Sequence, residues 1–485
     1  MPFREVRIRP VNPAQLAPVI GPVRMQELAE AVRGASLTLG SRTVVNVNST
    51  AVGGGVAELL ETLLGYARGG GVATRWFVVE GDAAFFDVTK RIHNGLYGSS
   101  GDGGPLSAAE AEMYERTLRA SAGDLDRQVR PGDIVILHDP QTAGLVPAFR
   151  RLGVTIVWRC HVGSDHSNEW TERSWTFLRP YLEDVDAFIF SRRHFAPTWA
   201  APEKTHVILP SINPFSTKNM QLSAAQVRGM LLAAGLIDGR GGTSTVEFRR
   251  ANGRRGVVRR RASVVREGPP PSPDAPLVVQ ISRWDRMKDM AGVMAGFAEG
   301  FDASLGAHLV LAGPRTDGVE DDPEAGQVFA ECEMQWAALP APVRSHVHLA
   351  LLPTADHDEN ATLTNALQRH ASVVCQKSLA EGFGLTVTEA MWKGRAVVAS
   401  AVGGIVDQIR GPRYGVLIDD PTDLAEFASA VDGLLRAPSE ARRIGANARR
   451  FTTKHMLSDR HLQQYAELIQ ALDAPRASAI ADTAA

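Results

Sequence analysis

Apolar residues in this chain gather in short runs rich in valine, isoleucine and leucine, and most of these runs are separated by stretches whose apolar positions recur with helical spacing. Strand-like runs that alternate with helical stretches predict parallel sheets with helices on both faces, so we expect an α/β protein. The predicted strands are residues 43–47, 76–79, 134–137, 154–158, 187–190 and 207–209 in the first half, and 277–281, 308–312, 347–352, 372–375, 396–399 and 416–418 in the second.

The length of 485 residues, with 44% hydrophobic content, is enough for two globular domains with cores of their own. We expect a first domain over residues 1–215 and a second over residues 216–451, with a hinge at 216–219. The second includes an arginine-rich hairpin over about residues 246–265, which turns at Asn252 and Gly253 and should be a solvated or interface excursion. Residues 441–474 are predicted to be helical, and the tail beyond Pro475 to fray.

The net charge and the cysteines of the chain argue against several classes of partner and environment. A formal net charge of -2 gives no overall attraction to nucleic acid or to an anionic membrane, and Phe248 is the one aromatic residue among the hairpin arginines. Cys160, Cys332 and Cys375 are far apart and lack metal-ligand spacing, so we interpret them as reduced core residues. No apolar run of eighteen residues or secretion signal is visible, and we therefore expect a cytoplasmic protein without a membrane partner.

The stretch SLAEGFGLTVTEAMWK, residues 378–393, has the pattern of a ligand-binding turn followed by a helix. Gly382 and Gly384 allow the backbone to approach a ligand closely. No helix breaker interrupts the run from Leu385, so the first N–H groups and the positive dipole end of the helix should face a phosphate. Glu381 and Glu389 flank the same site, where carboxylates can accept hydrogen bonds from sugar or ribose hydroxyls.

A pair of cations follows the predicted strand at 277–281. Arg283 and Lys288, in SRWDRMKD, are spaced to clamp a diphosphate, the arginine as a fork and the lysine as a point charge. Either motif alone is also compatible with a solvated loop that makes ordinary salt bridges. Together they favour a phosphate site at the carboxyl edge of the second sheet, where open sheets of this type bind ligands.

The strand ends of the first half carry a second group of polar residues. Gly54 and Gly55, in a glycine turn that begins at Gly53, are suited to present N–H groups to a ligand, although the turn is not the GxGxxG fingerprint. The glycine-rich stretch 93–105 should be a mobile loop near this edge. Each further polar residue is, taken alone, more often structural than functional; these residues are His138, Asp139, Gln141, His161 and Asp165.

Two acidic patterns invite a metal interpretation, but structural roles fit both better. Asp184 and Asp186 form a DxD between a predicted helix and a predicted strand, where capping or solvation is expected. Asp356 to Asp358 precede a helical stretch and suit its N-terminal charge preference. We therefore predict no metal site. The chain also lacks GxSxG, HExxH and Walker sequences, which argues against a serine hydrolase of that type, a zincin and a P-loop NTPase.

The two glutamates, the Arg-Lys pair and the glycine turn resemble the retaining nucleotide-sugar glycosyltransferases of the GT-B type. Longer strings resemble the branch of trehalose glycosyltransferring synthases and retaining trehalose phosphorylases over roughly residues 35–470. These strings include NVNSTAVGGGVAELL, HDPQTAGL, WRCHVGSD, SRWDRMKD and QKSLAEGFGLTVTEAMWKG. The resemblance implies two Rossmann-like domains facing an inter-domain cleft, with a final helix over about residues 452–474 that packs back on the first domain.

The resemblance also implies a role for each site residue. Arg283 and Lys288 would hold the donor diphosphate and Glu389 the ribose hydroxyls, while Glu381 would meet the donor glucose. The N–H groups of Phe383, Gly384 and Leu385 would bind phosphate, Gly54 and Gly55 would close over the donor, and His161 would contact the transferred glucosyl unit. The expected acceptor-side residues are Asn48, Asn94, Asp139 and Gln141.

The implied activity is a retaining glucosyl transfer that makes trehalose, reversibly, from a nucleoside-diphosphate glucose and glucose. No tightly bound cofactor is expected, with Mg as an optional companion of the nucleotide, and the partners would be these small molecules and a second copy of the chain in a homodimer. One alternative keeps the fold and replaces the nucleotide by inorganic phosphate, as in a retaining trehalose phosphorylase. A nucleotide-sugar epimerase and a non-catalytic sugar-binding protein are the others.

Overall fold

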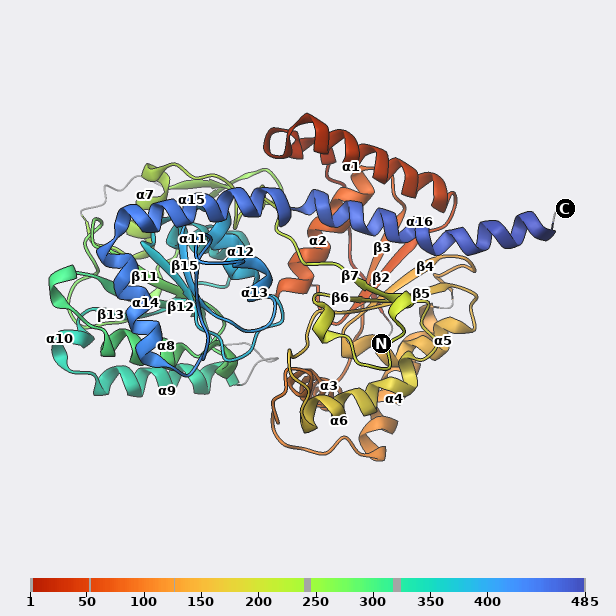
Figure 1. Cartoon of the computed structure of the whole chain (residues 1–485), viewed down its shortest axis with the longest axis horizontal. Coiled ribbons are helices and arrows are strands. Elements are labelled where there is room, and N and C mark those ends of the chain that lie inside the picture. The colour runs from red at the N-terminus through yellow and green to blue at the C-terminus, as the bar shows by residue number, and fades with distance from the viewer. Residues whose placement is uncertain (1–2, 52–53, 126, 240–245, 317–323, 484–485) are drawn as a thin grey trace. The chain divides into compact units, whose positions relative to one another are not determined.

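The computed structural model describes residues 3–51, 54–125, 127–239, 246–316 and 324–483. Its chain divides into two compact units (Figure 1). One unit holds Met1–Ser211 together with Met456–Ala485, and the other holds Ile212–His455. None of the helices described reaches both the length and the apolar character that crossing a membrane requires.

The first unit is built on one sheet of seven strands in the order β1-β3-β2-β4-β5-β6-β7. All neighbours are parallel except β1, which pairs antiparallel with β3. The predicted strands are confirmed, except that the last one lies two residues earlier than expected, because the chain leaves the sheet before Pro210. The strands are β1(Arg4–Glu5), β2(Val44–Asn48), β3(Thr74–Val78), β4(Ile134–His138), β5(Thr155–Cys160), β6(Ala187–Phe190) and β7(Thr205–Val207).

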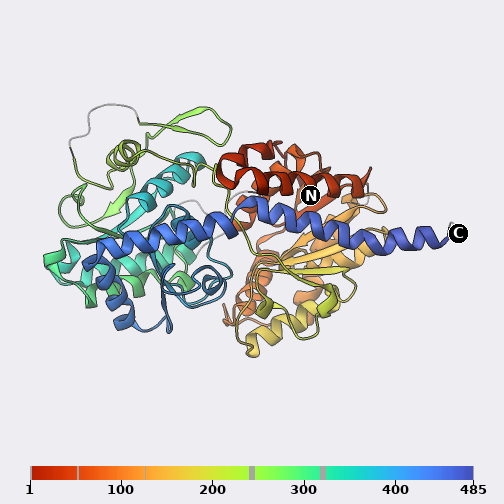
Figure 2. The ribbon, with the colours of Figure 1, turned by 45° about the horizontal axis from the view of Figure 1, so that its top comes forward.

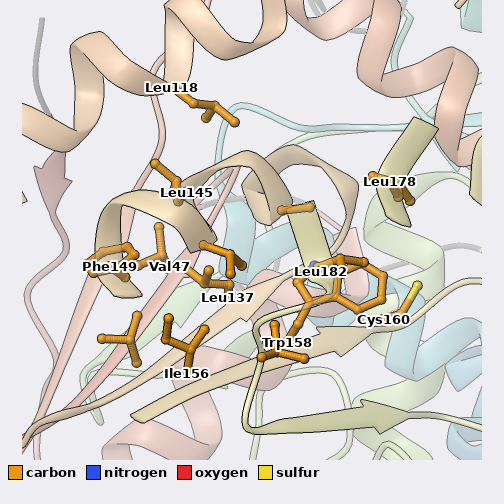
Figure 3. Packing of buried hydrophobic residues seen from close by; sticks show 14 of the residues in the cluster. Val47, Leu118, Leu137, Leu145, Phe149, Ile156, Trp158, Cys160, Leu178 and Leu182 are labelled. Carbon is orange, nitrogen blue, oxygen red and sulfur yellow. The ribbon is translucent and has the colours of Figure 1, made fainter. Parts of the chain in front are cut away.

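Helices cover both faces of this sheet. One core packs β-branched and aromatic strand residues such as Val47 and Trp158 against helix residues such as Leu118, Phe149 and Leu182 (Figure 3). On the other face Leu60 and Leu64 pack with Trp76, and α1 lies alongside the C-terminal helix α16 (Figure 2). The helices are α1(Ala17–Leu39), α2(Gly54–Gly69), α3(Ala83–Leu96), α4(Ala108–Leu125), α5(Val146–Arg150), α6(Glu169–Leu182) and α16(Ser458–Thr483).

The second unit also has a seven-stranded sheet, in the order β10-β13-β12-β11-β14-β15-β16. The strands are parallel except the edge strand β10, and all six strands predicted for this half are confirmed. The strands are β10(Ser263–Val265), β11(Leu277–Ile281), β12(His308–Pro314), β13(Val347–Leu352), β14(Val373–Gln376), β15(Ala396–Ser400) and β16(Val416–Ile418). The main helices around it are α7(Ala224–Ala234), α8(Met290–Glu299), α9(Glu324–Ala338), α11(His357–His370), α12(Leu385–Trp392), α14(Leu424–Arg436) and α15(Pro438–His455).

The arginine-rich segment forms a two-stranded hairpin, β8(Glu247–Arg249) with β9(Arg255–Val257). Its arginines are used in part to anchor it. The Arg250 guanidinium donates to the Asp356 carboxylate over 2.8 Å, and Arg260 donates to Glu359 over 2.5 Å. Asp356 is also the N-cap of α11, since it accepts from the Glu359 N–H. The acidic run before α11 therefore has the structural role that the sequence predicted.

The C-terminal part differs from the prediction of one helical stretch over residues 441–474. Two helices, α15 and α16, are separated at the buried residues Met456 and Leu457. The second continues to Thr483, where a frayed tail was predicted beyond Pro475. Alanines recur in this last segment, and alanine has the strongest intrinsic helix preference, which accounts for the continuation.

Candidate functional site

The strand order of the second unit defines where a ligand should bind. β12 and β13 follow β11 on one side of it, whereas β14, β15 and β16 lie on its other side. The connections that leave β11 and β14 thus diverge at a topological switch point, which is the usual binding position in open parallel sheets. Both motifs singled out in the sequence lie in these connections, one after Ile281 and one after Gln376.

The structure brings two predicted site residues into direct contact. Lys288 Nζ donates to Glu381 Oε2 over 2.6 Å, although the residues lie in different connections of the chain. Both side chains are largely but not fully covered, with 17% and 10% of their surface exposed. Ser378 Oγ also donates to Glu381 Oε2, over 3.3 Å. The glycine turn and the cationic segment that the sequence singled out are therefore parts of one polar group.

A buried frame holds the two connections together. The side-chain amide of Gln280 accepts from the Lys377 N–H over 2.9 Å and donates to the Lys288 carbonyl over 2.6 Å. The Lys377 ammonium, 1% exposed, donates to the Asp289 carboxylate, and Asp289 itself has a φ of 47°, unusual for a residue with a side chain. The sequence analysis missed these residues, and the charge of Lys377 directly after an apolar strand was the one available signal.

The glycine turn has little spare room. Gly384 has a φ of +78° and precedes α12, and a Cβ there would come within 3.1 Å of Glu381 Cγ. A Cβ on Gly403 would meet the Glu381 carbonyl oxygen at 1.6 Å. The Gln408 amide donates to the carbonyls of Phe383 and Gly384. Because α12 begins at Leu385, the N–H groups of Leu385 and Thr386 have no acceptor within the helix and can meet an anion, whereas the Val387 N–H donates to the Gly384 carbonyl over 2.9 Å.

Arg283 lies in the connection after β11 and is 54% exposed. Its Nη2 donates to Asp285 Oδ2 over 3.0 Å, and Asp285 in turn accepts from the Met287 N–H over 2.8 Å. The two predicted clamp cations thus have different carboxylate partners, Asp285 for Arg283 and Glu381 for Lys288. An anionic ligand at this edge would compete with both carboxylates for the cations.

Glu389 lies inside α12 and is buried, with 5% exposure. Its Oε1 is 3.7 Å from Lys218 Nζ. The neighbouring Lys393 donates to Gln368 Oε1 over 2.6 Å and to Asn219 Oδ1 over 3.0 Å. Burial lowers the pKa of Lys393 to about 7, although the Glu389 carboxylate opposes this. Glu389 therefore belongs to a buried polar group with two lysines.

In the first unit the strand order reverses between β2 and β4, and polar side chains again gather at the strand ends. Asp139, with a φ of 63°, accepts from the His161 backbone N–H over 2.7 Å, and its other oxygen lies 3.0 Å from His161 Nδ1. The rings of His138 and His161 stack with centroids 5.4 Å apart. The predicted residues Asp139 and His161 are therefore neighbours.

His161 also contacts a residue that the sequence analysis did not single out. Arg159 is fully buried, and its Nε donates to His161 Nε2 over 2.7 Å. Because side chains alternate along an extended chain, residues two positions apart, such as Arg159 and His161, point to the same side. This spacing was the pattern from which the pair could have been predicted. Burial lowers the pKa of His161, and the charge of Arg159 lowers it further against the opposing effect of Asp139. His161 is therefore neutral near pH 7.

The remaining predicted residues lie in the first unit but differ in their surroundings. Asn48 accepts from Trp76 Nε1 over 2.7 Å and donates to the Thr50 carbonyl over 2.6 Å, so its amide is committed within the fold. Gln141 Oε1 is a buried acceptor without a hydrogen-bond partner among the described residues. Gly54 has a φ of +76° at the start of α2, with Gly55 exposed beside it, while Gly53 lies outside the described residues.

The loop predicted over residues 93–105 is wrong at its start. Asn94 lies inside α3, which ends at Leu96, and its carbonyl accepts from the N–H groups of Tyr97 and Ser99. The reason is that Val88, Ile92 and Leu96 are buried at helical spacing, and this packing outweighs the neighbouring glycines. Asn94 is thus fixed on a helix, where the sequence had placed a mobile loop residue.

The other polar pairs of the first unit are structural. Asp186 accepts from the Ile156 N–H over 2.7 Å, which ties β5 to β6 and confirms the structural interpretation of the DxD. Arg192 and Asp165 form an ion pair of 2.5 Å. Within the described part of the chain, no group of three or more histidine, cysteine, aspartate or glutamate side chains is arranged to hold a metal ion.

Comparison with known proteins connects this geometry to a family. Residues 46–197 match the family model described as trehalose synthase, N-terminal domain, and residues 347–451 match glycosyl transferases group 1. Trehalose synthase of Pyrococcus horikoshii is 31% identical over 449 residues, which cover 93% of each chain. Trehalose phosphorylase of Pleurotus sajor-caju is 26% identical over 402 residues, which cover 76% of this chain and 50% of that protein.

The fold has relatives among solved structures. An α,α-trehalose-phosphate synthase (UDP-forming) from Burkholderia vietnamiensis matches with a TM-score of 0.64 at 15% identity, over 89% of this chain and 99% of that one. The fold is thus that of the GT-B glycosyltransferases, with two Rossmann-like sheets. Because 31% identity extends over 93% of both this chain and the Pyrococcus protein, the chain belongs to the trehalose synthase family of glycosyltransferases.

Proposed function

We propose that the protein is a retaining glucosyltransferase that makes α,α-trehalose, reversibly, from a nucleoside-diphosphate glucose and glucose. The observation that carries the proposal is the contact of Lys288 with Glu381 at the switch point of the second sheet. In a member of the trehalose synthase family, a cation and a carboxylate beside a glycine turn suit the diphosphate and the glucose of one donor. The UDP-forming enzyme that shares the fold supports a nucleotide as co-substrate.

In this proposal the second unit, Ile212–His455, binds the donor. Lys288 and Arg283 neutralise the diphosphate, and the N–H groups of Phe383, Gly384 and Leu385 bind its oxygens. Glu381 accepts from hydroxyls of the donor glucose. Glu389 accepts from the ribose hydroxyls, which requires that the ribose share this carboxylate with Lys218.

The first unit, Met1–Ser211 with Met456–Ala485, supplies the sugar-facing residues. His161 lies against the transferred glucosyl unit, and Asp139 keeps its ring in place. Gln141 offers an acceptor that is unpaired in the described structure, which suits a hydroxyl of the acceptor glucose. We assign Asn48 and Asn94 to the acceptor side, which requires that the sugar share the Asn48 amide with Trp76 and Thr50. Gly54 and Gly55 approach the donor through their backbone.

The chemistry is a same-face displacement without a protein nucleophile. The bond from the anomeric carbon to the phosphate oxygen breaks while the acceptor oxygen bonds to the same face of that carbon. The proton of the acceptor hydroxyl passes to the departing phosphate oxygen. Positive charge grows at the anomeric carbon and negative charge on the diphosphate, so Lys288 and Arg283 stabilise the transition state more than the ground state.

A trehalose phosphorylase is the nearest alternative, since it keeps the fold and replaces the nucleotide by phosphate. The Pleurotus phosphorylase is more distant from this chain than the Pyrococcus synthase, both in identity and in the share of its length that is matched. The nucleotide-dependent reaction is therefore favoured. An epimerase would convert the donor without any acceptor, and a sugar-binding protein would show no turnover.

The decisive test is a panel of co-substrates. The purified chain is incubated with trehalose and either ADP, UDP or inorganic phosphate, and the products are separated by anion-exchange chromatography. We expect a nucleoside-diphosphate glucose and free glucose with at least one nucleotide. Glucose 1-phosphate formed only with inorganic phosphate would establish the phosphorylase instead. Isomerised donor without acceptor would indicate the epimerase, and binding without any product the sugar-binding protein.

Three finer expectations belong to this proposal. Mg would accompany the nucleotide phosphates, which a titration with EDTA during turnover tests. A homodimer is expected, and light scattering of the purified protein measures it. The protein is expected to act in the cytoplasm.

A further inference from the structure

The group that surrounds His161 contains a buried cation without an anionic contact partner of its own. Arg159 is 0% exposed, and its hydrogen bonds go to neutral groups within the described structure. Nε donates to His161 Nε2 over 2.7 Å, and Nη2 donates to the Ile208 carbonyl over 3.2 Å. Nη1 lies 2.6 Å from Tyr465 Oη and 3.1 Å from His461 Nε2. A buried guanidinium with such partners is costly, which points to a function beyond packing.

These contacts decide the protonation of His161. Arg159 carries only donors, so His161 Nε2 must accept and cannot carry a proton. The proton of a neutral ring then resides on Nδ1, which faces the Asp139 carboxylate at 3.0 Å. Burial would raise the pKa of Asp139, but its contacts with His161, which include hydrogen bonds from the backbone N–H and from the ring, lower it to about 2. Asp139 is thus an anion and a permanent acceptor for Nδ1–H.

The arginine is held by the C-terminal helix. His461 and Tyr465 both lie on α16, and the Arg159 guanidinium is also 5.5 Å from the Tyr465 ring centroid. Ser211 Oγ lies 2.9 Å from His461 Nδ1, which leaves His461 Nε2 to accept from Arg159 when Nδ1 carries the proton. The packing of α16 on the first unit therefore holds the Arg159 guanidinium in place, and the guanidinium in turn holds the His161 ring.

We propose that Arg159 is a positioning residue, held by His461 and Tyr465, that locks His161 as the neutral Nδ1–H tautomer. The consequence for turnover rests on the proposed glucosyl transfer. Positive charge develops at the anomeric carbon, and an imidazolium at His161 would oppose it. Arg159 keeps the ring neutral, and Asp139 balances the charge of the guanidinium.

The ionisable groups around His161 come from three directions. His138 is the last residue of β4, and Asp139 comes directly after it. Arg159 lies on β5, and His461 lies on α16, with Arg460 next to it. Asp139 alone favours protonation of His161. Replacing Arg159 by a neutral residue removes the main opposing charge, so His161 should then take up a proton at a higher pH than in the wild type.

The test combines nuclear magnetic resonance with kinetics on the full chain. In protein with 15N-labelled histidine, the His161 signals are assigned by their loss in His161→Gln. We expect the neutral Nδ1–H tautomer in the wild type at pH 7. In Arg159→Met the His161 titration and the acid limb of kcat/KM should both move up by about one pH unit or more. In Tyr465→Phe the same shift should be smaller.

Arg24→Met is the matched control, because Arg24 ties α1 to α16 through Asp459 over 2.5 Å, whereas Arg159 contacts α16 through His461 and Tyr465. Both arginine variants loosen the docking of α16, but Arg24→Met should leave the His161 titration unchanged. An Nε2–H tautomer or an imidazolium in the wild type at pH 7 would overturn the proposal, even if Arg159→Met does not fold. An unmoved titration in a folded Arg159→Met would do so too. The expected tautomer in an inactive enzyme would instead contradict only the proposed function.

Discussion

The two sheet edges of this protein use opposite strategies for a polar site. At the edge of the second unit, glycines leave the backbone open, and cations such as Lys288 and Arg283 remain partly exposed. At the edge of the first unit, Arg159 and His161 are buried, and both ring nitrogens of His161 are engaged by protein groups. The first arrangement suits a highly charged ligand, which can remain partly in contact with water. The second suits a neutral sugar, whose hydroxyls would form hydrogen bonds with side chains held in fixed positions.

The contrast indicates how such an enzyme can divide its work. In the proposed function, Lys288 and Arg283 exchange their carboxylate partners for a diphosphate, and their partial exposure makes this exchange possible. A buried group of neutral imidazoles around one arginine cannot rearrange cheaply. The edge of the second unit would thus stabilise the changing charge of the diphosphate, and the edge of the first unit would hold the sugar in a fixed position.

The largest effect should come from Lys288→Ala. The substitution removes the cation that pairs with Glu381 and that the proposed reaction places beside the departing diphosphate, and the loss of one such stabilising group lowers kcat by about 10²–10³-fold. Steady-state kinetics with circular dichroism as a check on folding measures it. Arg286→Ala is the control, because Arg286 lies in the same connection but pairs with Glu331. Equal turnover in the two variants would contradict the role of Lys288.

Lys377→Met should affect stability more than catalysis. Lys377 is 1% exposed and pairs with Asp289, and removing one partner of a buried ion pair leaves the other charge uncompensated, at a cost of about 3 kcal/mol. Urea denaturation measures the change. The double variant Lys377→Met with Asp289→Asn should recover part of the loss. A single variant as stable as the wild type would show that the frame between the two connections is not held by this pair.

Gly403→Ala should cost activity through geometry alone. A methyl group would meet the Glu381 carbonyl at 1.6 Å, so the glycine turn must shift, and a displacement of about 1 Å in a catalytic site can cost about 10²-fold in rate. Gly306→Ala is the control, because Gly306 also has a positive φ, of 56°, but a Cβ there has nothing within 4 Å. If both variants keep full turnover, the turn is less tightly built than the structure indicates.

Acid should also destabilise the protein, gradually rather than in one step. Burial lowers the pKa of His138, His161 and His461 in the first unit, and of His308 to about 4 in the second. A histidine whose folded pKa is lowered takes up a proton only in the unfolded chain, so stability falls as pH drops below about 6.5, by at most about 1.4 kcal/mol per pH unit and group.

Urea titrations between pH 7 and pH 4.5 measure this loss. His308→Gln should reduce the slope of unfolding free energy against pH by the contribution of one titrating group. His461→Gln should reduce it by a similar amount, and the loss of the Arg159 contact should in addition lower stability at every pH. A stability that does not change over this range would mean that the buried imidazoles are protonated in the folded protein, which would also remove the basis for a neutral His161.

The sequence predicted the sheets well because strands are local patterns that appear as short apolar runs. The candidate residues Lys288 and Glu381 were found in the same way, since each follows a predicted strand within a few positions, and the structure brings them into contact. The roles of Arg159, His461 and Lys377 depend on residues that are distant in the chain, such as the 302 positions between Arg159 and His461. No local pattern encodes such contacts. Asn94 was misplaced for the same reason, since its helix is stabilised by burial.

The most direct test of the division between the two edges is a binding titration by calorimetry. ADP, UDP and trehalose are each titrated into the wild type, Lys288→Ala and His161→Gln. We predict that Lys288→Ala weakens nucleotide binding at least tenfold and leaves trehalose binding nearly unchanged, while His161→Gln does the reverse. Nucleotide affinity that depends on His161 and not on Lys288 would contradict the account.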